Sequence, residues 1–483
     1  MKKTLYILLF AASLILTGCN AWLSVTPYDK IAEDDLLSSP EGFRKLLNGV
    51  YIEMNSDNLY GSTLTVEMIE LMGGAYAVGT DNTVWGNYKD ISSYKFGTEY
   101  WRERFNQTWD AAYALILNCN RILEKAPEHK NEFIGDEYNI IRGEALALRA
   151  MLHFDMLRLF GPVYSRHSTS LSIPYYSGYT NVPQDILPAC DIAGKILSDL
   201  SDAKLLLMND PIIKNGTMMT PSGNNSSDFL RYRALRLNYY AVTALLARAE
   251  LYFGNKPAAF ENATEVIKAV ESGIFPFVDK SLVTGSPEDP DRIFASEVIF
   301  ALSHSSRNKL FKDYFDQSRL PSYVFRMDNS LIDNLIYGGS LTGGSKDDYR
   351  YKVNWVATGA NRYFHKYADK TNVGSIENTM IPMLRTGEMY LIAAEAQSDN
   401  LGSGISYVNQ LRKNRGVANL NTLNQDLLIY EYIRELYGEG QLFFLYKRLF
   451  HSVIFSASET SNPEPSDEIF TVPLPDTETE NRQ

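Results

Sequence analysis

The chain has few of the residues that metal and nucleophile chemistry usually require. Its 483 residues include 3 cysteines and 6 histidines, and none of them has the H-E-x-x-H or Cys-x-x-Cys spacing of zinc and redox sites. Residues 338–345 are rich in glycine but lack the Lys-Ser or Lys-Thr of a phosphate loop, and there is no G-x-S-x-G elbow. The sequence therefore predicts no metal, no cofactor and no catalytic residues.

The chain also has fewer basic residues than acidic residues. The chain has 46 Lys and Arg against 58 Asp and Glu, which gives a formal net charge of -12. A surface of this sign repels phosphate backbones, and no stretch gathers enough Lys and Arg to offset the repulsion. We therefore exclude nucleic acid as a partner. A glycosidase would need two carboxylates on either side of the scissile bond, and no pair among the acidic residues stands out for that role.

Long apolar runs are absent except at the beginning of the chain. Lys2 and Lys3 precede an apolar run over residues 5–16, which is far shorter than the ~20 residues that span a bilayer. The run leads into Leu-Thr-Gly and Cys19, the pattern cut by the lipoprotein signal peptidase. We expect residues 1–18 to be a signal peptide and Cys19 to carry acyl chains such as palmitate, which would anchor the protein to a membrane. The alternative is an ordinary secretory signal with an incidental cysteine.

Three residues of reactive types are interpreted as structural. Cys119 and Cys190 either form a disulfide or remain thiols, and their surroundings favour unpaired structural cysteines. His153 lies within a helical pattern, where a hydrogen-bonded structural histidine is expected rather than a metal ligand. A calcium ion in the acidic segment 286–292 is the alternative that we keep open.

Helical periodicity dominates the rest of the chain. Residues 140–160 form the clearest pattern, which Gly161 and Pro162 should end because glycine takes a left-handed cap and proline cannot continue the turn. One face of this helix carries Ala145, Leu148, Leu152, Met156 and Leu159 at steps of three and four.

Two further segments are predicted to form helical hairpins. A helix over 232–253 turns at 254–257 into a return helix that ends at Gly273, and residues 382–416 repeat the arrangement. These pairs resemble irregular tetratricopeptide hairpins, which bury their apolar faces only by stacking. We predict a mainly α fold in which such hairpins form a scaffold, with long loops and a few short strands.

Two long irregular segments interrupt the helical pattern. Residues 55–98 and 276–380 replace it with glycine, asparagine, serine and aromatic residues. Loops of this length are uncommon unless they bind something or are disordered, and the aromatic content argues against disorder. We therefore expect the functional site in these two segments. They belong to one ectodomain over residues 19–483, with an N-terminal part 19–275 and a C-terminal part 276–483.

Six short motifs, in this order, resemble the SusD/RagB family of outer-membrane nutrient-binding lipoproteins. After the lipidated cysteine come WLSVTPYDKIAEDDLLSSPEGFRKLLNGVY, WDAAYALILNCNRIL, RGEALALRAMLHFDMLRLFG, MLRTGEMYLIAAEA, IRELYGEGQLFFLYKR and a late VPLP. Together they cover nearly the whole mature chain, from Cys19 to Pro475.

The resemblance implies a fold, a function and a partner. It implies a lipoprotein of the outer membrane, exposed at the cell surface, that is not an enzyme. Such a protein captures a nutrient, usually a glycan, and passes it to a SusC-like TonB-dependent transporter. The alternatives are a lipid-anchored glycan hydrolase and a non-catalytic scaffold or adhesin.

The late motif departs from the family pattern. Where the family commonly has Glu-Gly-His-Arg-Trp-Phe-Asp, residues 439–445 read EGQLFFL, so that a His, an Arg and an Asp are lost together. Because leucine replaces the Arg and the Asp, we predict that the helix persists and that the core around it is repacked.

Aromatic residues in the irregular segments are the expected sugar-binding residues, because the apolar face of a pyranose lies flat on a ring. Three tryptophans are set aside: Trp22 lies next to the anchor, whereas Trp101 and Trp109 lie in an amphipathic motif that favours core packing. Trp355 keeps a core role as an alternative, because residues 353–355 alternate as in a strand. The predicted ligand-binding residues are Trp85, Asn87, Tyr88, Trp355, Tyr363 and Tyr76.

Overall fold

The structure is a computed structural model that describes most of the chain. The described residues are 36–78, 83–223, 228–284, 289–320, 323–371, 375–397, 401–453 and 463–480, with only the backbone of residues 83–85 and 401. The predicted signal peptide and Cys19 lie outside these ranges. Within them, no helix combines the length and the apolar character that crossing a membrane requires.

Helices make up most of the described chain, as the sequence predicts. The first half contains α3 (Pro40–Glu53), α4 (Met68–Met72), α5 (Thr83–Ser92), α6 (Glu99–Lys125), α7 (Glu137–Phe160), α8 (Tyr164–His167), α9 (Ala189–Leu206), α10 (Ile212–Asn215), α11 (Tyr239–Tyr252) and α12 (Lys256–Glu271). The second half contains α13 (Lys280–Thr284), α14 (Asn308–Tyr314), α15 (Tyr349–Asn354), α16 (Thr386–Ala396), α17 (Ile405–Asn414), α18 (Gln425–Leu436), α19 (Leu442–Leu449), α20 (Asp467–Phe470) and α21 (Asp476–Glu480).

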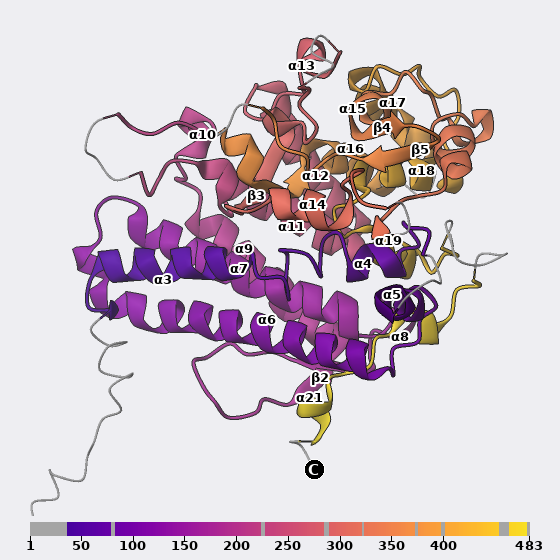
Figure 1. Ribbon diagram of the computed structural model, residues 1–483. Helices are drawn as coiled ribbons and strands as arrows, with labels where there is room; N and C mark the ends of the chain where they lie inside the picture. The colour runs from indigo at the N-terminus through magenta and orange to yellow at the C-terminus, as the bar shows by residue number, and fades with distance from the viewer. Residues whose placement is uncertain are drawn as a thin grey trace, which may run out of the picture.

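The long helices pack in sequence as stacked hairpins. α6 packs on α3 and α7, α7 on α9, α9 on α11, α11 on α12, and α12 on α16, which in turn packs on α17 and α18. Figure 1 shows α3, α6 and α7 side by side in the N-terminal half, with α15, α17 and α18 gathered at the opposite end of the molecule. The predicted mainly α scaffold of tetratricopeptide-like hairpins is confirmed.

Three short antiparallel ladders complete the fold of the described residues. β1 (Leu171–Pro174) pairs with β2 (Ile186–Pro188), and β4 (Trp355–Thr358) pairs with β5 (Asn361–Phe364). β3 (Val298–Ser303) pairs with β6 (Met380–Arg385), so that this ladder joins both ends of the second irregular segment.

The structure corrects two predicted helix beginnings and one predicted helix cap. Residues 382–385 belong to β6, and the helix expected from Pro382 begins at Thr386. The helix expected from residue 232 begins at Tyr239, because Tyr232 has a left-handed backbone and the Asn238 side chain caps the helix by accepting from Ala241 N at 3.0 Å. α7 ends before Gly161 as predicted, but Gly161 has φ -76° and takes no left-handed cap.

The irregular segments are more ordered than the sequence suggests. Residues 59–72 are buried: α4 in this stretch packs on α19, and Thr63 and Glu67 bond to Arg104 of α6. Residues 276–380 contain α13 to α15, β3 to β5 and several single turns of 3-10 or π-helix. Much of the chain that we expected to be open loop therefore builds the core.

The late family motif forms a buried ion-pair network. Glu435 on α18 accepts from Arg415 at 2.6 Å, from Arg385 at 2.7 Å and from Arg350 at 2.8 Å, and all four side chains are at most 3% exposed. Burial alone would raise the pKa of Glu435, but the three guanidinium groups outweigh burial and hold this pKa well below its usual range. The network joins α15, α17 and α18 to the end of β6.

The structure confirms the helix that was predicted to persist at the altered family motif. α19 begins at Leu442, and Leu442, Phe443 and Phe444 are buried. The guanidinium of Arg158 lies 4.0 Å from the centre of the Phe444 ring, and Arg158 also donates to Gln441 Oε1 at 3.0 Å. The core around this helix is thus packed by apolar rings, as the departure from the family pattern predicts.

The reactive residues are structural, as predicted. Cys119 is buried, Cys190 is partly exposed, and both are free thiols. His153 is fully buried: its Nδ1 lies 2.9 Å from Arg149 O and its Nε2 accepts from Tyr176 N at 3.1 Å. Burial lowers the pKa of His153 to about 3, so the ring is neutral in the folded protein.

This neutral histidine predicts a loss of stability in acid. Between pH 6.5 and pH 3 the unfolded chain binds a proton at residue 153 that the folded chain does not, so the free energy of unfolding falls as the pH falls. From pH 7.5 to pH 5, wild type should lose about 2 kcal/mol more than His153→Gln. Urea denaturation of both proteins at the two pH values measures the difference. Equal losses would show that His153 does not contribute to acid sensitivity.

Candidate functional site

The predicted binding residues of the first irregular segment lie on α5. The backbone of Trp85 belongs to this helix, but its side chain lies outside the described residues. Asn87 and Tyr88 are partly exposed, and Asn87 O accepts from the Trp101 indole at 2.6 Å. This bond ties α5 to the first turn of α6.

The expectation of exposed rings is wrong for three of the predicted residues. Tyr76 is 2% exposed, and Trp355 and Tyr363 are each 4% exposed. Trp355 packs against Phe364 and Tyr437 at centroid distances of 5.2 and 4.9 Å, which is the core role that its strand pattern left open. In this conformation none of the three presents a ring face to a ligand.

Three of the predicted aromatics nevertheless meet in one aromatic cluster. Phe325 lies between Tyr76 and Tyr314, with ring centroids 4.5 and 5.2 Å away and nearly parallel planes. Tyr88 meets the same Phe325 edge-on at 5.1 Å. Tyr437 contacts both Tyr76, at 6.0 Å, and Trp355, which brings the two irregular segments together. Tyr363 lies on β5 opposite Val356.

The exposed edge of this cluster is a tyrosine rim, which we define as Tyr88, Tyr100 and Tyr314 around Arg104. Tyr88 and Tyr314 are partly exposed, and Tyr100 is 37% exposed. All three interact electrostatically with Arg104, which lies one turn after Tyr100 on α6. The rim therefore offers aromatic rings beside a guanidinium group.

Charge and burial determine the protonation states of the residues in the tyrosine rim. Arg104 forms an ion pair with the buried Glu67 and donates to Thr63 Oγ1 at 2.7 Å. Burial opposes the charged form of Arg104, but Glu67 outweighs burial and raises the arginine pKa, so the guanidinium stays charged. Burial, with Glu67 second, raises the pKa of Tyr88, Tyr100 and Tyr314, and these hydroxyls stay protonated and can donate.

Sequence reasoning missed three members of the tyrosine rim. Tyr100 and Arg104 stand at positions i and i+4 of an amphipathic helix, where neighbouring side chains meet. That spacing was a usable signal. Tyr314 had no such signal, because only tertiary packing brings the end of α14 to Phe325.

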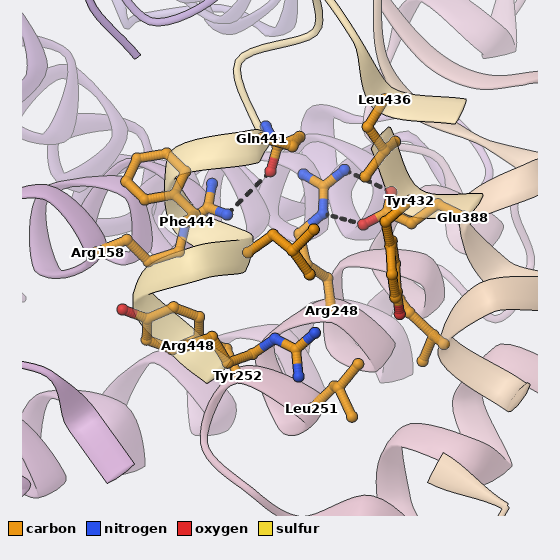
Figure 2. A pocket seen from close by; sticks show the side chains of 12 residues that line it. Arg158, Arg248, Leu251, Tyr252, Glu388, Tyr432, Leu436, Gln441, Phe444 and Arg448 are labelled. Carbon is orange, nitrogen blue, oxygen red and sulfur yellow. Dashed lines mark hydrogen bonds and ion pairs between the residues drawn. The ribbon is translucent and has the colours of Figure 1, made fainter. Parts of the chain in front are cut away.

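An internal cavity between the helical hairpins is too small for a nutrient. It has a volume of about 40 Å³, enough for a few water molecules. Figure 2 shows Arg248 of α11 reaching Glu388 of α16 across it, and Arg158 reaching Gln441. These contacts join the N-terminal and C-terminal hairpins, so we assign the cavity a structural role.

A larger groove of about 640 Å³ lies between α3 and residues 228–236. Arg236 is sandwiched there between Tyr51 and Phe229, with its guanidinium carbon 4.7 Å from each ring centre. The arginine is also paired with the fully buried Glu144 at 2.8 Å, and Arg44 is paired with Glu137. Internal carboxylates therefore engage these two cations, whereas Arg231, which also lines the groove, donates to Thr220.

Among the described residues, no cluster of three or more His, Cys, Asp or Glu is arranged to hold a metal. Part of the acidic segment 286–292 lies outside the described ranges. Within it, Asp289 accepts from Thr371, and Asp291 is buried and accepts from Ala295 N at 2.8 Å. Thr371 thus donates to both oxygens of Asp289, whereas the buried Oδ1 of Asp291 has no hydrogen-bond partner among the described residues.

The stacked hairpins with an aromatic, charged rim define a helical scaffold that can present rings to a ligand. Profiles of two known protein families match long parts of the sequence. A family profile described as "Starch-binding associating with outer membrane" matches residues 21–219, and the profile of the SusD family matches residues 331–469. Because the two profiles together cover most of the chain, the protein belongs to the SusD/RagB family, which confirms the resemblance seen in the sequence.

Curated relatives carry the same family name. SusD-like protein P38 of Formosa agariphila is 25% identical over 392 residues, which cover 69% of this chain and 70% of that protein. SusD-like protein P2 of the same organism is 25% identical over 164 residues, and the match spans only 34% of this chain and 31% of P2.

Solved structures share the fold. A SusD superfamily protein from Bacteroides thetaiotaomicron superposes with a TM-score of 0.69 at 19% identity, covering 92% of this chain and 98% of that one. A putative sugar binding protein from Bacteroides vulgatus also gives 0.69, at 21% identity and coverage of 92% and 96%. A laminarin binding SusD-like protein gives 0.63, at 16% identity and coverage of 91% and 96%.

Proposed function

We propose that this protein is a lipid-anchored, cell-surface lipoprotein of the outer membrane that binds a nutrient glycan and delivers it to a SusC-like TonB-dependent transporter. The observation that carries the proposal is the tyrosine rim around Arg104. It places three partly exposed tyrosines near one guanidinium group, and aromatic rings and hydrogen-bond donors are both needed to hold a sugar.

The chemistry of the tyrosine rim suits a pyranose. The C–H face of the sugar lies against an aromatic ring, and donors at its edge bind the hydroxyl oxygens. Tyr100 is the most exposed of the three rings, and Arg104 is fixed by Glu67 before any ligand arrives. A rim ordered in advance loses little conformational entropy on binding.

The proposal assigns no catalysis to the tyrosine rim. Glycoside hydrolysis needs two carboxyl groups roughly 5 to 10 Å apart, one of them an acid. The carboxylate paired with the rim arginine, Glu67, is buried and engaged by Arg104, Ser62 and Thr63. Such a group is poorly placed to donate a proton to a leaving group. Retention of intact glycan is therefore the expected behaviour.

The location rests on the beginning of the chain and on the family. The lipoprotein signal that ends before Cys19 supports lipid anchoring. The profile over residues 21–219 carries a description that associates its members with the outer membrane, which supports the compartment. The transporter partner rests on the resemblance to the family. Co-purification of a large outer-membrane barrel with the protein tests this part of the proposal.

Affinity electrophoresis in gels that contain laminarin, starch, mannan or xylan tests glycan binding. We expect at least one glycan to retard wild type, and Tyr100→Ala to weaken that binding about tenfold, since a stacking contact contributes roughly 0.5–1.5 kcal/mol beyond its buried area. Leu205→Ala removes an exposed apolar side chain from α9 and should leave binding unchanged.

The same samples separate the alternatives. Incubated with the retarding glycan for hours, the wild type should release no smaller products. Product release would favour a hydrolase. Absence of retardation by all four glycans, or equal retardation of wild type and Tyr100→Ala, would contradict a sugar-binding tyrosine rim.

A further inference from the structure

A second aromatic hollow lies on α6, which we call the α6 groove. It has a volume of about 280 Å³ and is lined by two partly exposed rings, Tyr113 of α6 and Tyr176 of the loop after β1. Trp109 of α6 also lines it but is only 4% exposed, so it supports Tyr113 rather than presenting a ring of its own. Asp110, Asn181 and Glu478 of α21 also line it. Figure 1 shows α21 below α6, near β2.

The α6 groove is independent of the tyrosine rim. Arg104 and Tyr113 are nine residues apart on one helix, which is about two and a half turns at 3.6 residues per turn. The two side chains therefore leave α6 on opposite faces. A ligand in the groove does not share contacts with a ligand at the rim, and each site can be changed without the other.

The rings of the α6 groove are held in place by the protein. Tyr113 lies 4.4 Å from Trp109 and 5.5 Å from Tyr176 between ring centroids, and its hydroxyl donates to Pro174 O at 3.0 Å. Tyr176 N donates to His153 Nε2, and the Tyr176 hydroxyl accepts from Gln184 N at 3.3 Å. A ligand would therefore meet an ordered aromatic surface.

Polar groups at the edge remain available for a ligand. The side chains of Asp110 and Asn181 are exposed, and neither forms a hydrogen bond or ion pair with another described residue. α21 is fixed beside them, because Arg102 Nε donates to Asp476 Oδ2 at 2.9 Å. A carboxylate and an amide that face a ring-lined hollow match the donors and acceptors of sugar hydroxyl groups.

We propose that the α6 groove is a second saccharide-binding site that takes one or two neutral sugar units. Its volume falls just below the ~300–1,000 Å³ typical of ligand pockets, which suits a short unit rather than a long chain. Among the described residues that line it, none is Lys or Arg, and two are acidic, so anionic sugars are disfavoured. The proposal deepens the proposed function and rests on it for the class of ligand.

Saturation-transfer NMR with methyl glycosides of glucose, galactose, mannose and xylose tests the α6 groove. The experiment uses Tyr100→Ala as the background, so that signal from the tyrosine rim is reduced. We expect at least one glycoside to bind this protein, and Tyr176→Ala added to it to weaken binding at least tenfold. Tyr176→Phe keeps the ring and should retain binding.

A second variant distinguishes loss of the binding site from misfolding of the protein. Asp110→Lys places a long side chain at an exposed position with no protein partner, so the fold should persist while the groove is obstructed and binding is lost. Circular dichroism and the melting temperature check each protein. Absence of binding by all four glycosides, or binding that persists in both Tyr176→Ala and Asp110→Lys, would overturn the proposal that the α6 groove binds a saccharide.

The two proposals fail in different ways. If Tyr100→Ala weakens glycan retardation in gels while methyl glycosides do not bind, only the proposal for the α6 groove is contradicted. If Tyr176→Ala abolishes methyl glycoside binding while Tyr100→Ala leaves retardation unchanged, the proposal for the tyrosine rim is contradicted and the proposal for the α6 groove is supported.

Discussion

Glu435→Ala is expected to lower the free energy of unfolding by about 3–5 kcal/mol, the range measured when one partner of a buried ion pair is removed. The carboxylate of Glu435 is the shared acceptor of Arg350, Arg385 and Arg415. Its loss leaves three buried guanidinium groups with less negative charge around them. Urea denaturation followed by circular dichroism measures the change.

An exposed pair provides the control for Glu435. Glu41 and Lys45 form an ion pair at 2.7 Å on the surface of α3, where both side chains are more than 60% exposed. Glu41→Ala should leave the free energy of unfolding nearly unchanged, because such i,i+4 pairs contribute little in water. If the two variants lost similar stability, the buried network would not be what joins α18 to its neighbours.

Gly440→Ala is expected to be the second strongly destabilising change, by about 2–5 kcal/mol. Gly440 has φ +68°, where an L side chain costs roughly 1–2 kcal/mol, and an added Cβ would lie 2.0 Å from Leu64 O. Relieving this clash must move backbone, which adds an overpacking cost of about 1–3 kcal/mol. The melting temperature and the yield of soluble protein report the effect.

A helical glycine provides the control for Gly440. Gly194 lies within α9, and an added Cβ meets no atom within 4 Å. Gly194→Ala should therefore raise the free energy of unfolding by roughly 0.5–1 kcal/mol. A stable Gly440→Ala protein would mean that the turn before α19 does not press against Leu64 as the structure has it.

The sequence predicts the helices well because their signals are local. The end of α7 follows from Pro162, and the return helix α12 follows from its apolar spacing and from Gly273, which has φ +87°. The strand β6 was missed for a different reason. Its apolar run continues directly into α16, and only pairing with the distant β3 makes residues 380–385 extended.

The candidate site was predicted in part. Reasoning from the sequence placed Tyr76, Tyr88 and Trp355 in the region of interest, and they do share one aromatic cluster. It did not predict which rings face outward, since the burial of Trp355 depends on Tyr437 and Phe364. Exposure is a property of tertiary packing, which is why Tyr100 was found only in the structure.

The late family motif illustrates the difference between resemblance and role. Its residues identified the family from the sequence alone, yet Glu435 and Gly440 serve the core and have no contact with solvent that a ligand could use. Their part is to fix the end of α18 and the beginning of α19. Tyr437 lies between these two helices in the chain and packs against Tyr76 and Phe364. The motif therefore contributes Tyr437 to the aromatic cluster but supplies no residue of the tyrosine rim.

A crystal structure of the protein with the glycan that retards it tests the central claim most directly. The account predicts a sugar ring stacked on Tyr100 or Tyr314, with a hydroxyl oxygen within hydrogen-bond distance of Arg104 and the glycan intact. A glycan bound far from both the tyrosine rim and the α6 groove, or one cleaved between two carboxylates, would contradict it.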